Sequence, residues 1–73
     1  MQLQAGRQIA VLVNGERTET GAASLRELVA QLGFGDAQVA TALNGEFVPR
    51  QARGDIRLAP DDRVEIVAPR QGG

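Results

Sequence analysis

The residues best placed to do chemistry are the two glycines that end the sequence, Gly72 and Gly73. Neither has a Cβ, so a chain ending in them can enter a slot too narrow for any side chain. The carboxylate of Gly73 is unhindered but unreactive, and adenylation by ATP is the simplest way to give it a leaving group for a nucleophile. The pattern predicts a C-terminus that another protein modifies at Gly73.

Residues 69–73 are expected to form a flexible tail that carries this group away from the folded body. An extended chain of this length reaches about 16–18 Å, far enough to enter the active site of a partner. Gln71 and Gly72 contribute to this reach, and Arg70 is a candidate to pair with acidic groups of the partner. A terminus without function is the alternative, because nine of the 73 residues are glycine and chance then gives a Gly-Gly end at odds of about 1–2%.

The composition excludes most self-contained catalysis. The sequence has no Cys and no His, which removes disulfides, the common zinc ligands and catalytic triads. Asp61 and Asp62 are neighbouring carboxylates, which we interpret as a solvated turn rather than a cation site. We therefore expect a protein co-substrate that is not an enzyme, with no metal and no bound cofactor.

Charge and hydropathy limit the partners. The formal net charge is −1 and all eight basic residues are Arg, but acids alternate with them, which argues against a nucleic-acid surface. No apolar run approaches the length of a membrane span, and residues 1–8 lack the basic and apolar blocks of a signal peptide. The expected partners are proteins, and the expected location is the cytoplasm.

Two Asn-Gly pairs predict tight turns, because both central residues of a type I′ turn need positive φ. Asn14–Gly15 separates two alternating stretches, and these predict strands at Ile9–Val13 and Glu16–Thr20. Asn44–Gly45 lies in a third alternating stretch, "VATALNGEFVP" at 39–49, where Pro49 ends the pairing because it has no N–H to offer.

The clearest helix signal is "SLRELVAQLGF" at residues 24–34. Ser24 and Glu27 have the spacing of a capping box, which satisfies two free amides at a helix start. Gly33 is expected to end the helix in a left-handed conformation and to leave Phe34 folded back on Val29. One apolar stripe follows the helical period and consists of Leu25, Leu28, Val29 and Leu32.

The remaining segments complete the predicted fold. Residues 51–60 are expected to be irregular, with Ile56 and Leu58 filling the core, and "RVEIVAP" is expected to be the last strand. One amphipathic helix covers only one face of a sheet, so the order of elements predicts an α+β domain with about four to five strands in a mixed sheet. We expect an N-terminal extension at 1–8, the domain at 9–68 and the tail at 69–73.

The alternation of each strand predicts which side chains the helix leaves uncovered. In the last strand Val64, Ile66 and Ala68 point inward, while Val67 points outward. Small apolar residues gathered on the uncovered face would form a modest docking surface for partner proteins. Its predicted members are Ala10, Leu12, Ala40, Ala42 and Val67.

Three motifs together resemble a known family. They are "VNGE" at 13–16, "ALNGEFVPR" at 42–50 and "DDRVEIVAPRQGG" at 61–73. The sequence from about Ile9 to Gly73 is similar to the ThiS family of bacterial sulfur carriers, which are ubiquitin-like β-grasp proteins of thiamine biosynthesis. The sequence departs from that pattern in its extra residues 1–8, in Gln51–Arg53 where an aromatic is common, and in Asp61–Asp62 where Gly-Asp is frequent.

The resemblance implies a specific role for Gly73. A ThiF-like adenylyltransferase would use ATP to activate Gly73, a sulfur donor such as a cysteine desulfurase would supply the sulfur, and the resulting thiocarboxylate would deliver it to thiazole synthase, ThiG. Two rivals share the fold and the terminus: the MoaD-like small subunit of molybdopterin synthase, and a protein modifier conjugated to lysines through Gly73. A plain binding domain with an incidental tail is the third alternative.

Overall fold

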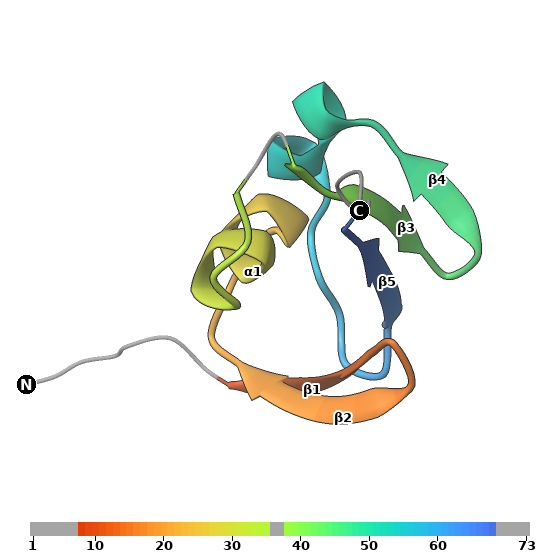
Figure 1. Cartoon of the computed structure of the whole chain (residues 1–73). Helices are drawn as coiled ribbons and strands as arrows, with labels where there is room; N and C mark the ends of the chain where they lie inside the picture. Colours follow the sequence, from red (N-terminus) through yellow and green to blue (C-terminus); the bar gives the residue numbers. More distant parts are fainter. Residues whose placement is uncertain (1–7, 36–37, 69–73) are drawn as a thin grey trace, which may run out of the picture.

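The computed structural model describes residues 8–35 and 38–68. Within them a sheet of five strands carries one α-helix on one face (Figure 1). In chain order the elements are β1 (Ile9–Val13), β2 (Glu16–Thr20), α1 (Leu25–Gln31), β3 (Ala40–Leu43), β4 (Glu46–Val48), the 3₁₀-helix η2 (Arg50–Asp55) and β5 (Arg63–Val67).

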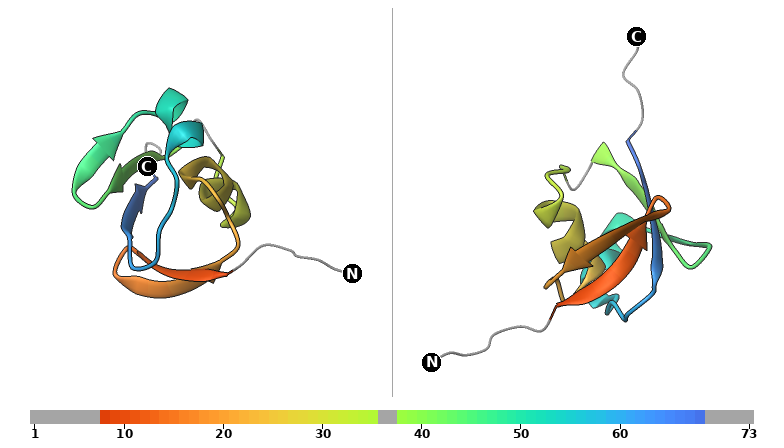
Figure 2. Two further views of the ribbon diagram at one scale, coloured as in Figure 1. Left: turned by 180° about the vertical axis from the view of Figure 1, so that it is seen from behind. Right: turned by 90° about the horizontal axis from the view of Figure 1, so that it is seen from below.

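The sheet has the strand order β2-β1-β5-β3-β4, so the last strand of the chain lies in the middle. β5 runs parallel to β1 and antiparallel to β3, while β1–β2 and β3–β4 are antiparallel hairpins. This confirms the predicted α+β class with a mixed sheet. The two views of Figure 2 show α1 on one side of the sheet and β5 between the two hairpins.

Both hairpins turn on Asn-Gly pairs with the predicted backbone. Asn14 has φ 52° and Gly15 has φ 86°, and the second turn repeats these values with 50° at Asn44 and 88° at Gly45. Positive φ at both central residues matches the right-handed twist of the flanking strands. The two turns therefore connect their strands in the same way, and each depends only on its own Asn-Gly pair.

The helix begins and ends much as its sequence predicts. Ser24 Oγ accepts a hydrogen bond from the backbone N–H of Glu27 at 3.2 Å, and Glu27 Oε1 accepts from the N–H of Ala23 at 2.9 Å. The glutamate thus reaches one residue further back than the capping-box pattern predicts. Gly33 has φ 88°, and the N–H of Phe34 donates to the carbonyl of Val29, which confirms the predicted C-terminal motif.

The core lies between α1 and the face of the sheet that the helix covers. Its apolar residues are at most 8% exposed, and Ile56 and Leu58 pack against them as predicted. The buried members are Val11, Leu25, Leu28, Val29, Val39, Val48, Val64 and Ile66.

Two sequence predictions about the second half of the chain are wrong. Residues 50–55 form η2 rather than an irregular connection, and Arg53 within it is only 2% exposed. Ala68, predicted to point inward, is exposed, because β5 ends at Val67. The pairing of β5 with β3 stops at Val67 and Ala40, where β3 begins.

Candidate functional site

The predicted reactive end of the chain follows directly from β5. Gly73 and the tail residues Arg70, Gln71 and Gly72 lie outside the described residues, as does the predicted extension apart from Gln8. The predicted boundaries between extension, domain and tail stay predictions. The described part of the candidate site is therefore β5, its neighbours and the surface beside its end.

The last residues of β5 are held on both sides. On the β3 side, Val67 pairs with Ala40. On the β1 side the main-chain ladder pairs Val13 with Val64, and the N–H of Asn14 donates to the carbonyl of Val64 at 2.8 Å. The chain of β1 then turns away into β2, so any further contact on that side must come from a side chain.

The side chain of Asn14 makes that contact. Its Nδ2 donates to the carbonyl of Ile66 at 3.1 Å, and its Oδ1 accepts from the N–H of Ile66 at 2.9 Å. The amide thus replaces the strand residue that would otherwise pair with Ile66. Sequence analysis identified Asn14 only as a turn residue, because its partner lies 52 positions away along the chain.

The opposite face of the sheet from α1, called here the outer face, carries the predicted docking residues. Ala40 lies across from Val67 in the register, and Ala42 lies across from Glu65. Val67 is 61% exposed, whereas Ala42 and Leu12 are half-buried. Ala10 is half-buried as well. The structure thus brings Ala40, Ala42 and Val67 together near the end of β5.

Sequence analysis missed the most exposed large apolar side chain among the described residues, which is Phe47 at 70% exposure. Phe47 pairs with Ala42 across β3 and β4, and it continues the row that Ala42 forms with Glu65. The signal was present in the sequence, because Val48 points inward in the same short strand and its neighbour must then point outward. We call Ala40, Ala42, Phe47 and Val67 the outer patch.

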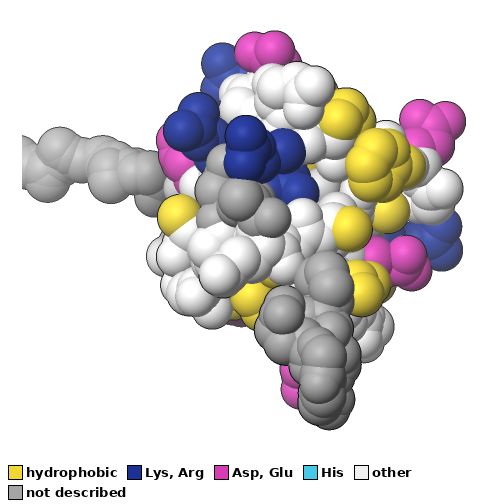
Figure 3. Space-filling view, turned by 45° about the horizontal axis from the view of Figure 1, so that its top comes forward, with side chains coloured by type: hydrophobic (Ala, Val, Ile, Leu, Met, Phe, Trp, Pro, Cys, Tyr) yellow, Lys and Arg dark blue, Asp and Glu magenta, His cyan; other side chains and the backbone are white. Residues whose placement is uncertain are grey.

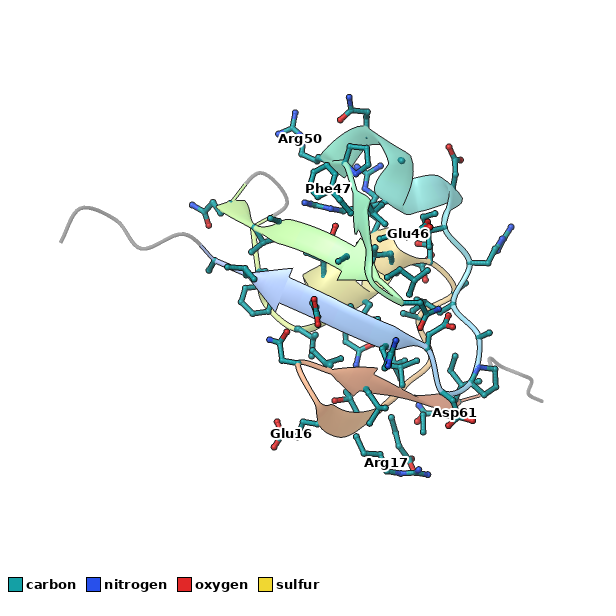
Figure 4. The ribbon with its side chains drawn as sticks, turned by 90° about the vertical axis from the view of Figure 1, so that its right-hand side faces the viewer. Glu16, Arg17, Glu46, Phe47, Arg50 and Asp61 are labelled. Carbon is teal, nitrogen blue, oxygen red and sulfur yellow. The ribbon has the colours of Figure 1, made fainter. Side chains whose placement is uncertain are left out.

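The outer patch occupies one side of the outer face rather than its whole width. Figure 3 shows hydrophobic side chains gathered on the side of the molecule that carries β3, β4 and β5, with acidic and basic side chains around them. In Figure 4 Phe47 and Arg50 lie towards the β4 edge, and Glu16 and Arg17 lie towards the β2 edge. The exposed aromatic side chain of the outer face therefore lies near β4, with the charged Arg50 beside it and Glu65 in the same cross-strand row.

The paired carboxylates Asp61 and Asp62 belong to the turn before β5. Asp61 has φ 70°, and the carboxylate of Asp62 accepts from Asn44 Nδ2 at 3.1 Å and from the N–H of Ala59 at 2.8 Å. Both oxygens of Asp62 thus hold the loop. Within residues 8–35 and 38–68, no three acidic side chains gather as metal ligands would. Over the same residues, no helix has the length and apolar character needed to cross a membrane.

Comparison with known proteins connects this geometry to a family. A model of the ThiS family matches residues 11–73. The crystal structure of a thiamine biosynthesis protein (ThiS) from Geobacter metallireducens is 33% identical, with a TM-score of 0.71, and the match covers 89% of this chain and 100% of that one. The NMR solution structure of a thiamine biosynthesis protein from the same organism is 29% identical, with a TM-score of 0.74, and covers 89% of this chain and 88% of that one.

No curated protein matches the chain. The mixed five-stranded sheet with a single helix is the β-grasp arrangement that the resemblance implied. The family model extends over far more than half of the sequence and includes its Gly-Gly end. The chain therefore belongs to the ThiS family.

Proposed function

We propose that this chain is a sulfur carrier of thiamine biosynthesis and that it carries the sulfur as a thiocarboxylate on Gly73. The observation that carries the proposal is the family match, which runs from residue 11 to residue 73 and so includes the terminal glycines. The similar solved structures from Geobacter metallireducens are described as thiamine biosynthesis proteins. The position of β5 is consistent with the proposal, because the last strand before the Gly-Gly end of the sequence lies in the middle of the sheet with a strand on each side.

The chemistry takes place in two steps at the terminal carboxyl group. In the first, a carboxylate oxygen of Gly73 attacks the α-phosphorus of ATP, pyrophosphate leaves, and an acyl-adenylate forms. In the second, a sulfur nucleophile attacks the acyl carbon and displaces AMP. When the nucleophile is a protein persulfide, a thiol reductant then cleaves the S–S bond and releases the thiocarboxylate.

This chain contributes the substrate group and the surfaces that deliver it, and other proteins supply the catalysis. The proposed partners are a ThiF-like adenylyltransferase, a sulfur donor such as a cysteine desulfurase, and the thiazole synthase ThiG, which takes up the sulfur. ATP is consumed by the activating enzyme. Absence of a side chain at Gly72 and Gly73 allows the tail to enter the narrow sites of these enzymes.

The outer patch is proposed as the docking surface that brings the body of the carrier to these partners. Exposed apolar patches mark protein interaction sites, and phenylalanine is among the residues enriched in protein interfaces. Phe47 and Val67 are the two large apolar side chains that the described residues expose most. Arg70 is proposed to pair with acidic groups at the entrance of the partner's site.

The deciding experiment is intact mass spectrometry of the full chain after incubation with ATP, magnesium, a ThiF-like adenylyltransferase and a sulfur source. We expect a mass shift equal to the replacement of one oxygen by sulfur. A variant lacking Gly73 should show no shift in mass, because its chain ends at Gly72 and is one residue too short for the carboxylate to reach the active site. An unchanged mass of the wild-type chain under conditions that modify a known carrier would contradict the proposal.

Adding further components separates the sister functions. With ThiG and its substrates the thiocarboxylate should be consumed and thiazole phosphate should form. Formation of a dithiolene with a molybdopterin synthase subunit, or attachment of Gly73 to lysines of other proteins, would instead support one of the two rivals. The chain has no Lys of its own, so it cannot form an isopeptide-linked polymer with itself.

A further inference from the structure

The two Asn-Gly turns look equivalent in sequence, but they hold different ends of β5. Asn44 acts at the beginning: its N–H donates to the carbonyl of Arg63 at 2.7 Å, and its Oδ1 accepts from the N–H of Arg63 at 2.9 Å. Asn14 acts at the end, where its side chain makes both hydrogen bonds to the backbone of Ile66. Of the two turns, only Asn14–Gly15 therefore contacts the end of β5.

The contact of Asn14 matters because the main-chain pairing of β1 stops earlier. β1 contributes the pairs Leu12–Arg63 and Val13–Val64, and then its chain leaves for β2. Without the amide of Asn14, the N–H and carbonyl of Ile66 would have no partner from β1. The right-hand view of Figure 2 shows the β1–β2 turn beside β5, and the hydrogen bonds of Asn14 to Ile66 join the two.

We propose that Asn14 is a positioning residue for Gly73: its side-chain amide fixes the point at which the chain leaves the sheet and thereby limits the conformations of the tail. This inference rests on the proposed function, because it assigns Asn14 a role in presenting the terminal carboxylate. Loss of the amide frees the end of β5 on one side. In such a variant more residues must lose conformational freedom each time the C-terminus enters an active site. That loss of conformational entropy is unfavourable.

The test uses a matched pair of full-length variants, Asn14→Gly and Asn44→Gly. Glycine accepts the positive φ of both positions, 52° and 50°, so each turn is kept. Each substitution removes two side-chain hydrogen bonds: Asn14 loses both to Ile66, and Asn44 loses those to Arg63 and Asp62. The two variants thus differ in which end of β5 they release.

Adenylation is followed by ATP–pyrophosphate exchange with a ThiF-like adenylyltransferase, with the carrier varied at saturating ATP. For Asn14→Gly we expect kcat to fall about tenfold. This factor corresponds to the entropy that is lost when roughly one more backbone residue becomes ordered. KM should change less than about twofold, since the outer patch is untouched and still docks the body. Asn44→Gly should keep both constants within about twofold of wild type, because exposed changes away from the reacting group have small effects.

A purely structural role predicts a different outcome, because a smaller folded fraction lowers the concentration of usable carrier and raises the apparent KM with kcat unchanged. That pattern, or equal effects of the two variants on kcat, would overturn the inference. Asn14→Asp gives a graded control: it keeps the acceptor for the N–H of Ile66, loses the donor to the carbonyl, and should lie between wild type and Asn14→Gly.

Amide hydrogen exchange provides a second readout that needs no enzyme. In Asn14→Gly the N–H of Ile66 should exchange faster while that of Val64 keeps its protection, and in Asn44→Gly the N–H of Ile66 should be unaffected. Unaltered exchange at Ile66 in Asn14→Gly would overturn the inference by itself. Failure of the wild-type chain to be activated would instead refute the proposed function, and the exchange result would still decide whether Asn14 holds the end of β5.

Discussion

The two faces of the sheet are made by the same strands and yet meet different requirements. On the face covered by α1, Val11 and Val64 are 1% exposed, whereas Phe47 and Val67 on the outer face are 70% and 61% exposed. Alternation along each strand separates the two sets, because neighbouring side chains point to opposite faces. The comparison teaches that one set of positions specifies the fold and leaves the other set free to bind partners.

The largest effect is expected from the covered face. Leu28 of α1 is fully buried in the core, so Leu28→Ala should lower the free energy of unfolding by about 2–5 kcal/mol, the range for removing a buried leucine side chain. A domain of this size has a stability of only about 5–10 kcal/mol in total, so this loss is a large fraction of it. Urea titration followed by circular dichroism measures the change. A loss comparable to that of an exposed substitution would break the comparison between the faces.

Much of the fold was predictable because its signals are local. Each Asn-Gly pair determines its own turn, Ser24 and Glu27 lie on one turn of helix, and Gly33 ends that helix through its own φ. The features that were missed depend on distant residues. Arg53 is buried through contacts with β3, and the end of β5 at Val67 depends on where β3 begins.

The second prediction concerns Arg53, a polar exception within the core. Its Nε donates to Thr41 Oγ1 at 2.9 Å and a terminal nitrogen donates to the carbonyl of Val39 at 2.6 Å, while Thr41 Oγ1 donates to the carbonyl of Val48. Arg53 thereby connects η2 to β3 and, through Thr41, to β4. The buried guanidinium thus serves the covered face by fixing the strands from which the outer patch projects.

We expect Arg53→Met to reduce the free energy of unfolding by about 1–3 kcal/mol, because methionine fills much of the volume but leaves the buried carbonyl of Val39 without this donor. The control is Arg57→Met at an exposed arginine, for which a change within about 0.5 kcal/mol is expected. Both are measured by thermal and urea unfolding. Equal stabilities of the two variants would show that the hydrogen bonds of Arg53 contribute little.

The candidate site was predictable in its chemistry and less so in its surroundings. The terminal glycines indicate a modified carboxylate by their residue type alone, and alternation placed Ala40, Ala42 and Val67 on one face. Phe47 was missed because the sequence analysis did not predict which residues of the short strand β4 point towards the helix and which point outward. The role of Asn14 was not accessible to sequence reasoning, since the hydrogen bonds to Ile66 exist only after β1 and β5 have come together.

The smallest effect on stability, and the sharpest test of the outer face, is expected from Phe47→Ala and Val67→Asp. Both side chains are mostly exposed, so the free energy of unfolding should change by less than about 1 kcal/mol. Truncation of an interface anchor typically weakens binding by about tenfold or more, and KM for adenylation should rise accordingly while kcat stays close to that of wild type. Leu12→Asp is a less selective test because Leu12 is half-buried, so stability and docking would change together.

Steady-state kinetics with the adenylyltransferase measures these constants, and Glu19→Gln is the matched control. Glu19 lies on β2, pairs with Ala10 and is exposed, so it lies on the β2 side of the outer face, away from the outer patch. If KM is unchanged in both Phe47→Ala and Val67→Asp, docking does not use this patch. If Glu19→Gln raises KM as much as they do, the contact extends across the whole face and depends on charge as well as on apolar anchors. A rise in KM confined to the two patch variants would show that alternate residues of the same strands have different roles. Those that face α1 stabilise the fold, and those on the outer face bind the partner.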